Sequence, residues 1–380
     1  MRSVVALICN VLLICIVGVL LYEYFPFPPI VWRMLFVCIC LGCVIARAIS
    51  RQMTGAEKRI LLFVGLNLLY YIIALADERT GITTAWGNIL FALLSISAFA
   101  YIGRQGIWTE RAISWWFGGL LVACVVYFYN MRDSLLVSNA LDDDARITNN
   151  ASIAFVMLMP WLFVLKKRWL AVIGLFVCLF YIVLSAKRGS IVAAVVPSVL
   201  FIVFYARTFN AWWKKGLFLV AILLALLGGV WAFLNEDEYL QRRLEETKAG
   251  ESSGRDAIFR NALDCWWYSD DAQFWLGHGF FATVPELGKM AHNDWLEILV
   301  DYGLVGFVLY ASIVWGLWRQ YRYEKTLTGR MVLLSCISIW VLRSLFSMVF
   351  FEQTLAIMNV PLGMVLGLKQ HHSNNYHEDR

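Results

Sequence analysis

Long apolar runs separated by short polar connections dominate the chain. A membrane-spanning helix needs about 20 mostly apolar residues, and runs of that kind recur along the whole sequence. Residues 151–184 and 331–368 can be divided into helices in more than one way. The sequence predicts an all-α polytopic membrane protein with about 12 spans, near residues 4–21, 30–49, 60–76, 82–102, 112–130, 151–165, 169–184, 191–206, 216–234, 295–317, 331–350 and 354–368.

Lys and Arg are unevenly distributed over the polar connections. With the N-terminus inside, the inner segments hold 19 basic residues. The short outer loops hold only Arg79, Arg132, Arg146, Lys187 and Arg188. Membrane proteins concentrate basic residues on the cytoplasmic side. The distribution therefore predicts that both termini are cytoplasmic and that the long loops lie on the outer face.

Two polar segments are long enough to form structure on that face. Residues 131–150 contain the acidic run Asp142-Asp143-Asp144, which is typical of a solvated loop. Residues 235–294 hold 12 Asp/Glu against 6 Lys/Arg, and they predict a helix over 239–247, a second one from a Ser253 cap to about Trp267, and a tight turn over 276–280. The chain thus divides into helices one to nine (1–234), an outer loop with candidate chemistry (235–294), and three last helices with a tail (295–380).

The composition excludes a soluble globular protein. Hydrophobic residues make up 61% of the chain and charged residues 16%, whereas soluble domains are about half apolar and about a quarter charged. The 17 Trp and 16 Tyr fit helices anchored among membrane lipids at two interfaces. The first apolar run has no small-residue cleavage site before Tyr22, so we expect a retained helix. Nothing in the pattern indicates a nucleic-acid partner.

The cysteines give no framework for disulfides or metals. Eight of the nine lie in apolar runs, and only Cys265 lies in a polar segment. Cys38, Cys40 and Cys43 cluster within one span but have no His or acidic neighbours, so they are interpreted as apolar filling. No metal site and no cofactor are expected.

The stretch from His292 to Gly306 carries the most specific candidate chemistry. His292 stands where the outer loop meets the tenth span, and Asn293 or Asp294 would cap that helix. Gly303 and Gly306 lie on one face and would let another element approach closely. A histidine there can take a proton from a hydroxyl. Taken alone, it is as well explained as a capping or anchoring residue.

Cations at four further positions could bind an anion on the same face. Lys187 and Arg188 stand at the outer end of the seventh span, where basic residues are disfavoured, and Arg is suited to bidentate phosphate binding. Arg255 would begin a loop helix, beside free backbone N–H groups. Arg343 is expected near the outer end of its span. Each also has an ordinary interpretation, as a snorkelling side chain or a surface ion pair.

Together, one base and several cations favour transfer chemistry on a lipid-linked pyrophosphate. A transporter or channel is the alternative from another class, and it would need polar residues along the middle of the membrane. Apart from Asn67 and Arg343, the centres of the predicted spans are almost purely apolar. This pattern disfavours transport.

These residues also resemble a known family. His292-Asn293, nine residues, then Gly303-x-x-Gly306 fits the H-[NSQ]-x9-G-x-x-[GTY] signature of O-antigen ligases, within the O-antigen ligase/polymerase (Wzy_C-type) superfamily. Residues 187–190 look like its Ser-Arg-Gly element, with Lys187 in the place of Ser. Residues 253–255, followed by a helix and Gly277-x-Gly279, look like its central periplasmic segment. The similarity covers about 185–306.

The resemblance implies a metal-independent glycosyltransferase of GT-C-like architecture in the bacterial inner membrane. Its donor would be a glycan on undecaprenyl pyrophosphate, and its acceptor a lipid A–core sugar in a ligase or another lipid-linked glycan in a polymerase. By similarity, His292 would be the base at the periplasmic face. Arg188 and Arg255, with Lys187 and Arg343, would hold the pyrophosphate, while Asn293, Gly303 and Gly306 would support the histidine. The complete signature favours the ligase.

Overall fold

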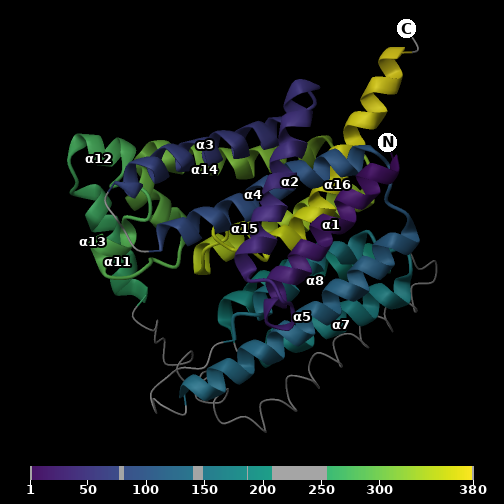
Figure 1. Ribbon diagram of the computed structural model, residues 1–380, viewed down its shortest axis with the longest axis horizontal. Helices are drawn as coiled ribbons and strands as arrows, with labels where there is room; N and C mark the ends of the chain where they lie inside the picture. The colour runs from purple at the N-terminus through teal and green to yellow at the C-terminus, as the bar shows by residue number, and fades with distance from the viewer. Residues whose placement is uncertain (1, 77–80, 140–148, 186, 208–254, 379–380) are drawn as a thin grey trace. The chain divides into compact units, whose positions relative to one another are not determined.

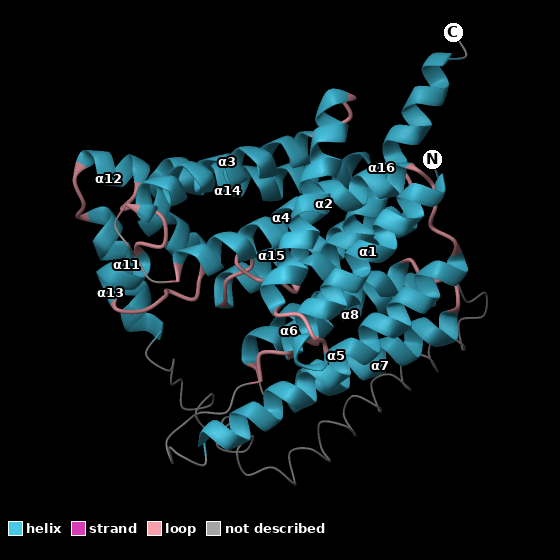
Figure 2. Cartoon of the chain, viewed as in Figure 1, coloured by secondary structure: helices cyan, strands magenta, loops and turns pink. Residues whose placement is uncertain are grey.

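The computed structural model describes residues 2–76, 81–139, 149–185, 187–207 and 255–378, although the side chains of 133–139, 255 and 369–378 are not described. These residues contain helices and connections but no strand (Figure 2). Eight described helices are long and apolar enough to cross a membrane. The chain forms two compact units, here called the first unit (1–108 with 253–380) and the second unit (109–252).

The first unit holds most of the long helices. Two residues of its α16, Gly363 and Gly367, lie against the backbone of α4, where an added Cβ at Gly367 would be 2.4 Å from the Ala100 carbonyl oxygen. Small residues permit such close packing in a membrane. Asn359 adds a 2.7 Å bond to the Ala92 carbonyl. The helices are α1 (Arg2–Leu20), α2 (Pro29–Ile49), α3 (Gly55–Leu75), α4 (Ile82–Arg104), α14 (Asp294–Tyr323), α15 (Leu327–Phe346) and α16 (Leu355–Glu378).

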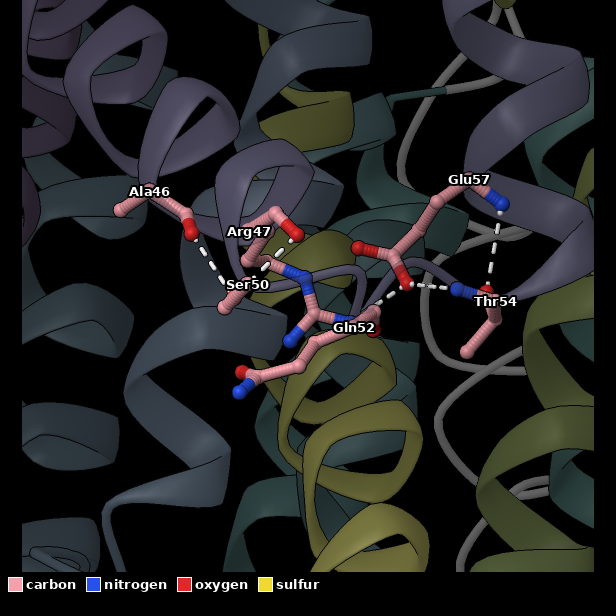
Figure 3. Close-up of polar contacts among 6 residues, drawn as sticks. All are labelled: Ala46, Arg47, Ser50, Gln52, Thr54 and Glu57. Carbon is pink, nitrogen blue, oxygen red and sulfur yellow. Dashed lines mark hydrogen bonds and ion pairs between the residues drawn. The ribbon is translucent and has the colours of Figure 1, made fainter.

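A buried ion pair closes the connection between α2 and α3 (Figure 3). The Arg47 guanidinium donates to the Glu57 carboxylate at 2.6 Å, and both side chains are fully buried. The same carboxylate accepts from the Thr54 backbone N–H at 2.8 Å, while the Thr54 hydroxyl accepts from the Glu57 N–H. This capping box begins α3 and places Glu57 against Arg47. Each charge therefore has a partner, which a buried ion requires.

The second unit is built around aromatic and small residues. Phe155 of α6 stacks on Tyr181 of α7 with ring centroids 4.8 Å apart. An added Cβ at Gly174 would lie 2.5 Å from the Phe117 ring, so only glycine fits there. The elements are α5 (Glu110–Asn139), α6 (Ser152–Leu158), the 3-10 helix η2 (Met159–Phe163), α7 (Arg168–Leu184) and α8 (Arg188–Ala206).

Three short helices cover one end of the first unit, and the start of α1 and the end of α16 lie toward the opposite end (Figure 1). They are α11 (Arg255–Trp267), α12 (Asp271–Leu276) and α13 (Thr283–Leu287). The predicted helix ending near Trp267 is confirmed, and so is the turn at 276–280, where Gly277 and Gly279 have positive φ. We call this layer, residues 255–293, the outer cap.

The structure revises the predicted spans. Eight helices in the described part of the chain qualify as spans, so the number 12 stays a prediction. Residues 151–165 do not form one long helix, because α6 gives way to η2 around Pro160, which lacks an N–H for the α-helical ladder. The predicted span 354–368 corresponds to the beginning of α16. The apolar part of this helix is shorter than a typical span. The predicted elements at 216–234, 239–247 and Ser253 lie outside the described residues.

Candidate active site

His292 sits at the junction of the outer cap and α14. Its backbone is left-handed, with φ of 52°, and its side chain is exposed. Among non-glycine residues this conformation is uncommon and is associated with functional sites. The carboxylate of Glu297 accepts a 2.8 Å bond from the Ala291 N–H, on the other side of the turn. The His292 side chain is therefore exposed, while the backbone of the preceding residue, Ala291, is bound by Glu297.

Asn293 caps α14, as one of the two predicted alternatives. Its side-chain oxygen accepts from the N–H groups of Trp295 at 3.0 Å and Leu296 at 3.2 Å. Its amide nitrogen donates to the Leu345 carbonyl at 3.1 Å. Asn293 thus accepts from two free N–H groups at the start of α14 and also ties this helix to the end of α15. The position after His292 is therefore fixed by three bonds.

Asp294, the other predicted cap, is instead the centre of a buried network. It is fully buried, and its carboxylate accepts from the Tyr310 hydroxyl at 2.6 Å and the Ser344 hydroxyl at 2.8 Å. The Val349 N–H donates to it at 2.9 Å. Arg343, in the last turn of α15, is also fully buried and lies within electrostatic reach of Asp294. The prediction that this end of the span faces outward stays a prediction, and the Arg343 side chain is enclosed.

Asp301, two turns further along α14, anchors the outer cap. This buried carboxylate accepts from the Thr283 N–H at 3.0 Å, the Thr283 hydroxyl at 2.8 Å and the Phe281 N–H at 3.2 Å. Phe281 has a φ of 58°, so the chain turns sharply into this acceptor. Sequence reasoning missed Asp301. The spacing Asp294-x-x-Glu297-x-x-x-Asp301 places three acids on one helical face, and that pattern was the available signal.

Gly303 breaks α14 beneath the outer cap. Its φ of 61° and ψ of −162° interrupt the helix, and an added Cβ would lie 2.5 Å from the Trp275 carbonyl carbon. The carbonyls of Val300 and Asp301 accept from the N–H groups of His278 at 2.8 Å and Gly279 at 2.9 Å. The element that approaches at Gly303 is therefore the end of α12 and the turn after it. The break leaves helix carbonyls available to bind that turn.

Gly306 and the mid-span Asn67 have packing roles nearby. An added Cβ at Gly306 would lie 2.2 Å from the Tyr302 Cβ, so glycine makes room for that ring. The Tyr302 hydroxyl donates to the Asn67 side-chain oxygen at 2.6 Å, and Asn67 donates to the Phe63 carbonyl at 2.7 Å. Asn67 therefore joins α3 to α14 through a buried hydrogen bond, as expected for a polar residue inside a membrane helix bundle.

Lys187 and Arg188 stand at the start of α8 in the second unit. Both side chains are half-buried, and the Lys187 ammonium contacts the side-chain oxygen of Asn150. Ser190 in the first turn of α8 shares a 3.0 Å hydrogen bond with Ser152 of α6. A helix N-terminus with two cations is a favourable place for an anion, because its first N–H groups lack helical acceptors.

The predicted site residues are thus distributed over both units. His292, Asn293, Gly303, Gly306 and Arg343 belong to the first unit, and Lys187 and Arg188 to the second. Within the first unit, the bond from Asn293 to Leu345 brings the His292 turn next to the end of α15. Arg255 begins α11, and its side chain lies outside the described part of the structure.

Fold and site together define an α-helical multi-pass membrane protein with a helical outer cap and an exposed histidine at a helix start. The comparison with protein families then identifies the chain more closely. Residues 173–311 match the Wzy_C family, described as O-antigen ligase, and the chain carries that domain. A comparison with curated protein sequences gave no match. The match includes the Lys187-Arg188 pair and the whole stretch from His292 to Gly306, and it suggests lipid-linked glycan substrates.

Proposed function

We propose that this protein is an O-antigen ligase, which transfers a glycan from undecaprenyl pyrophosphate to a lipid A–core sugar at the periplasmic face of the bacterial inner membrane. The observation that carries the proposal is the Wzy_C match over 173–311, which contains the His292-Asn293…Gly303-x-x-Gly306 signature. The exposed, conformationally restrained His292 at the start of a capped helix supports it.

In this mechanism His292 is the general base. Its imidazole takes the proton of the acceptor hydroxyl while the hydroxyl oxygen forms a bond to the anomeric carbon of the donor. The bond between that carbon and the pyrophosphate oxygen breaks, and undecaprenyl pyrophosphate leaves with the electron pair. The bonds of Asn293 and Glu297 on either side of His292 limit the motion of its backbone. A restrained backbone helps to hold a general base in one position relative to its substrate.

The leaving pyrophosphate requires positive charge and hydrogen-bond donors. We assign this role to Arg188 and Arg255, each at the first position of a helix, and to Lys187, which directly precedes Arg188. Helix N-termini add free N–H groups to the side-chain charge. Arg343, in the last turn of α15, is included as a further cation, and its burial near Asp294 favours an effect through the local field. This chemistry needs no metal ion.

The base assignment is tested most cleanly by His292→Asn. Asparagine tolerates the left-handed backbone at this position, whereas alanine adds strain, so His292→Asn removes the base with the least structural change. With purified protein, lipid-linked donor and lipid A–core, we expect transfer to fall about 10²- to 10⁴-fold. Donor binding and the melting temperature should stay near those of the unaltered protein. Transfer within a few-fold of the unaltered rate would reject His292 as the base.

The cation assignment has a matched control on α11. Arg255→Ala should raise the KM for the donor, while Arg260→Ala, an exposed arginine of the same helix, should not. Arg188→Lys keeps the positive charge but loses the planar fork of the guanidinium, so this variant should retain donor binding only in part. Equal effects of the Arg255 and Arg260 substitutions would argue against a specific pyrophosphate contact.

A polymerase that extends a lipid-linked glycan is the second candidate, because the family match covers both types of reaction. The two differ in acceptor. A ligase attaches the glycan to lipid A–core, whereas a polymerase yields longer lipid-linked chains when lipid A–core is absent. The same reaction mixture, with and without lipid A–core, separates them by the mobility of the products.

Sidedness is part of the proposal. Positioning both termini in the cytoplasm places the outer cap in the periplasm. A His292→Cys variant in a Cys265→Ser background should react with a membrane-impermeant maleimide added outside intact spheroplasts. Labelling only after lysis would place residue 292 on the cytoplasmic side and overturn the mechanism.

A further inference from the structure

Three side chains with metal-binding atoms meet inside the outer cap. Cys265 comes from α11, His278 from the turn between α12 and α13, and Glu286 from α13. The Cys265 sulfur lies 3.7 Å from His278 Nε2, and His278 Nδ1 lies 3.9 Å from the Glu286 carboxylate. One ligand atom from each residue lies within 4.8 Å of the others. Three separate segments thus converge on one point.

The backbone around this cluster is well fixed. The His278 backbone N–H donates to the Val300 carbonyl at 2.8 Å, so the backbone at His278 is fixed to α14 shortly before its break at Gly303. Cys265 packs on a buried apolar cluster that includes Ile258, Ala262 and Val300. The His278 side chain is only 10% exposed, while the Glu286 side chain is 46% exposed. The fold therefore positions two of the ligands, Cys265 and His278. The third, Glu286, is partly exposed to solvent and can move to complete the site.

The cluster could instead be a thiol–imidazole–carboxylate relay, because its two contacts use opposite ring nitrogens. A relay needs only successive pairwise contacts, whereas a metal site needs one atom of every residue near a common point. Here one ligand atom from each of the three residues lies within 4.8 Å of the others, and the set combines thiol, imidazole and carboxylate. The geometry therefore supports a metal site.

We propose that Cys265, His278 and Glu286 bind a divalent zinc ion that joins α11 to the turn before α13. Thiolate, imidazole and carboxylate are the donors zinc prefers, and three protein ligands leave a fourth position for water. Binding releases the thiol proton to solvent as the sulfur–zinc bond forms. The ion clamps the outer cap, and the glycan-transfer chemistry proposed above does not depend on it.

The test measures metal directly, without an activity assay. The chain's tail contains His371, His372 and His377, so these are replaced by alanine in every variant and no polyhistidine tag is used. The purified protein is stripped with a chelator, dialysed against Zn²⁺, and its zinc content measured. We expect about one zinc per chain, which falls to near zero in Cys265→Ser and His278→Ala and binds more weakly in Glu286→Gln. Cys38→Ser, at an exposed cysteine of α2, is the matched control and should keep its zinc.

Two measurements on the protein with an intact Cys265 guard against variants that fail to fold. Co²⁺ in place of Zn²⁺ should give a thiolate-to-cobalt charge-transfer band, which only a sulfur ligand produces. Zn²⁺ should also slow alkylation of Cys265 by a maleimide and raise the melting temperature. A missing charge-transfer band, or zinc retained in Cys265→Ser, would overturn the proposal. Alkylation that stops glycan transfer with no metal bound would favour the relay instead.

Discussion

The break in α14 at Gly303 gives a quantitative test of how the outer cap is attached. Its φ of 61° and ψ of −162° fall in a region that is essentially restricted to glycine. An added Cβ would lie 2.5 Å from the Trp275 carbonyl carbon and 2.6 Å from the Gly277 nitrogen. Both are backbone atoms, so no flexible side chain can move aside. Gly303→Ala must therefore distort either α14 or the end of α12.

The magnitude follows from two terms. The backbone conformation costs a non-glycine residue on the order of 1–3 kcal/mol, and overpacking against fixed atoms costs about 1–3 kcal/mol more. We expect Gly303→Ala to destabilise the protein by about 2–6 kcal/mol in total. That is a large fraction of the roughly 5–15 kcal/mol typical of whole proteins. The bonds from His278 and Gly279 to α14 are the first contacts to be lost.

The assay is thermal unfolding of detergent-solubilised protein, followed by tryptophan fluorescence. Gly87→Ala in α4 is the matched control, because no atom lies within 4 Å of its added Cβ and its backbone is helical. That control should be unchanged or stabilised by up to about 1 kcal/mol. Gly277→Ala breaks the same contact from the other side, so the double variant should cost less than the sum. Equal melting temperatures for Gly303→Ala and Gly87→Ala would refute the reasoning.

Substitutions at three further sites probe buried polar contacts, each checked by the same melting assay. Asp301→Asn weakens three hydrogen bonds, including both from Thr283, and should cost about 1–3 kcal/mol; no change would mean that the outer cap is held by packing alone. Asn293→Ala should cost about 1 kcal/mol through loss of the helix cap. Asn293→Asp should retain much of the stability that the cap provides, because aspartate is also a good capping residue. Arg47→Met leaves Glu57 as a buried charge and should cost about 3–5 kcal/mol, of which a simultaneous Glu57→Leu recovers most.

The apolar runs predicted the membrane helices well, because length and hydrophobicity are local properties. Three predicted spans match helices to within two residues at each end: 30–49 corresponds to α2, 82–102 to α4 and 169–184 to α7. Hydrophobicity does not report helical continuity, however, and so the change from α6 to η2 was missed. The short α12 and α13 were also missed, because five or six residues carry too little periodicity.

The candidate site shows the same division between local and distant information. Asn293 as a cap was predictable, since its partners are two and three residues away. The role of Asp294 was not, because its acceptor oxygens are satisfied by Tyr310, Ser344 and Val349, which only the tertiary fold brings near. The cluster of Cys265, His278 and Glu286 was not predicted, for a similar reason. The partners of Cys265 lie 13 and 21 residues away along the chain, in segments that the sequence predicted only as turn and loop.

The spacing from Asn293 to Gly303 has a mechanical explanation. Nine residues lie between them, so the ten steps from one to the other make about 2.8 helical turns or roughly 15 Å. The N-terminal end of this segment binds α15 through Asn293 and Asp294, and the other end binds the outer cap through Asp301 and the break at Gly303. A helix is stiff over that length, so a displacement at either attachment is transmitted to the other. His292 directly precedes the segment, and its orientation therefore depends on both the membrane bundle and the outer cap.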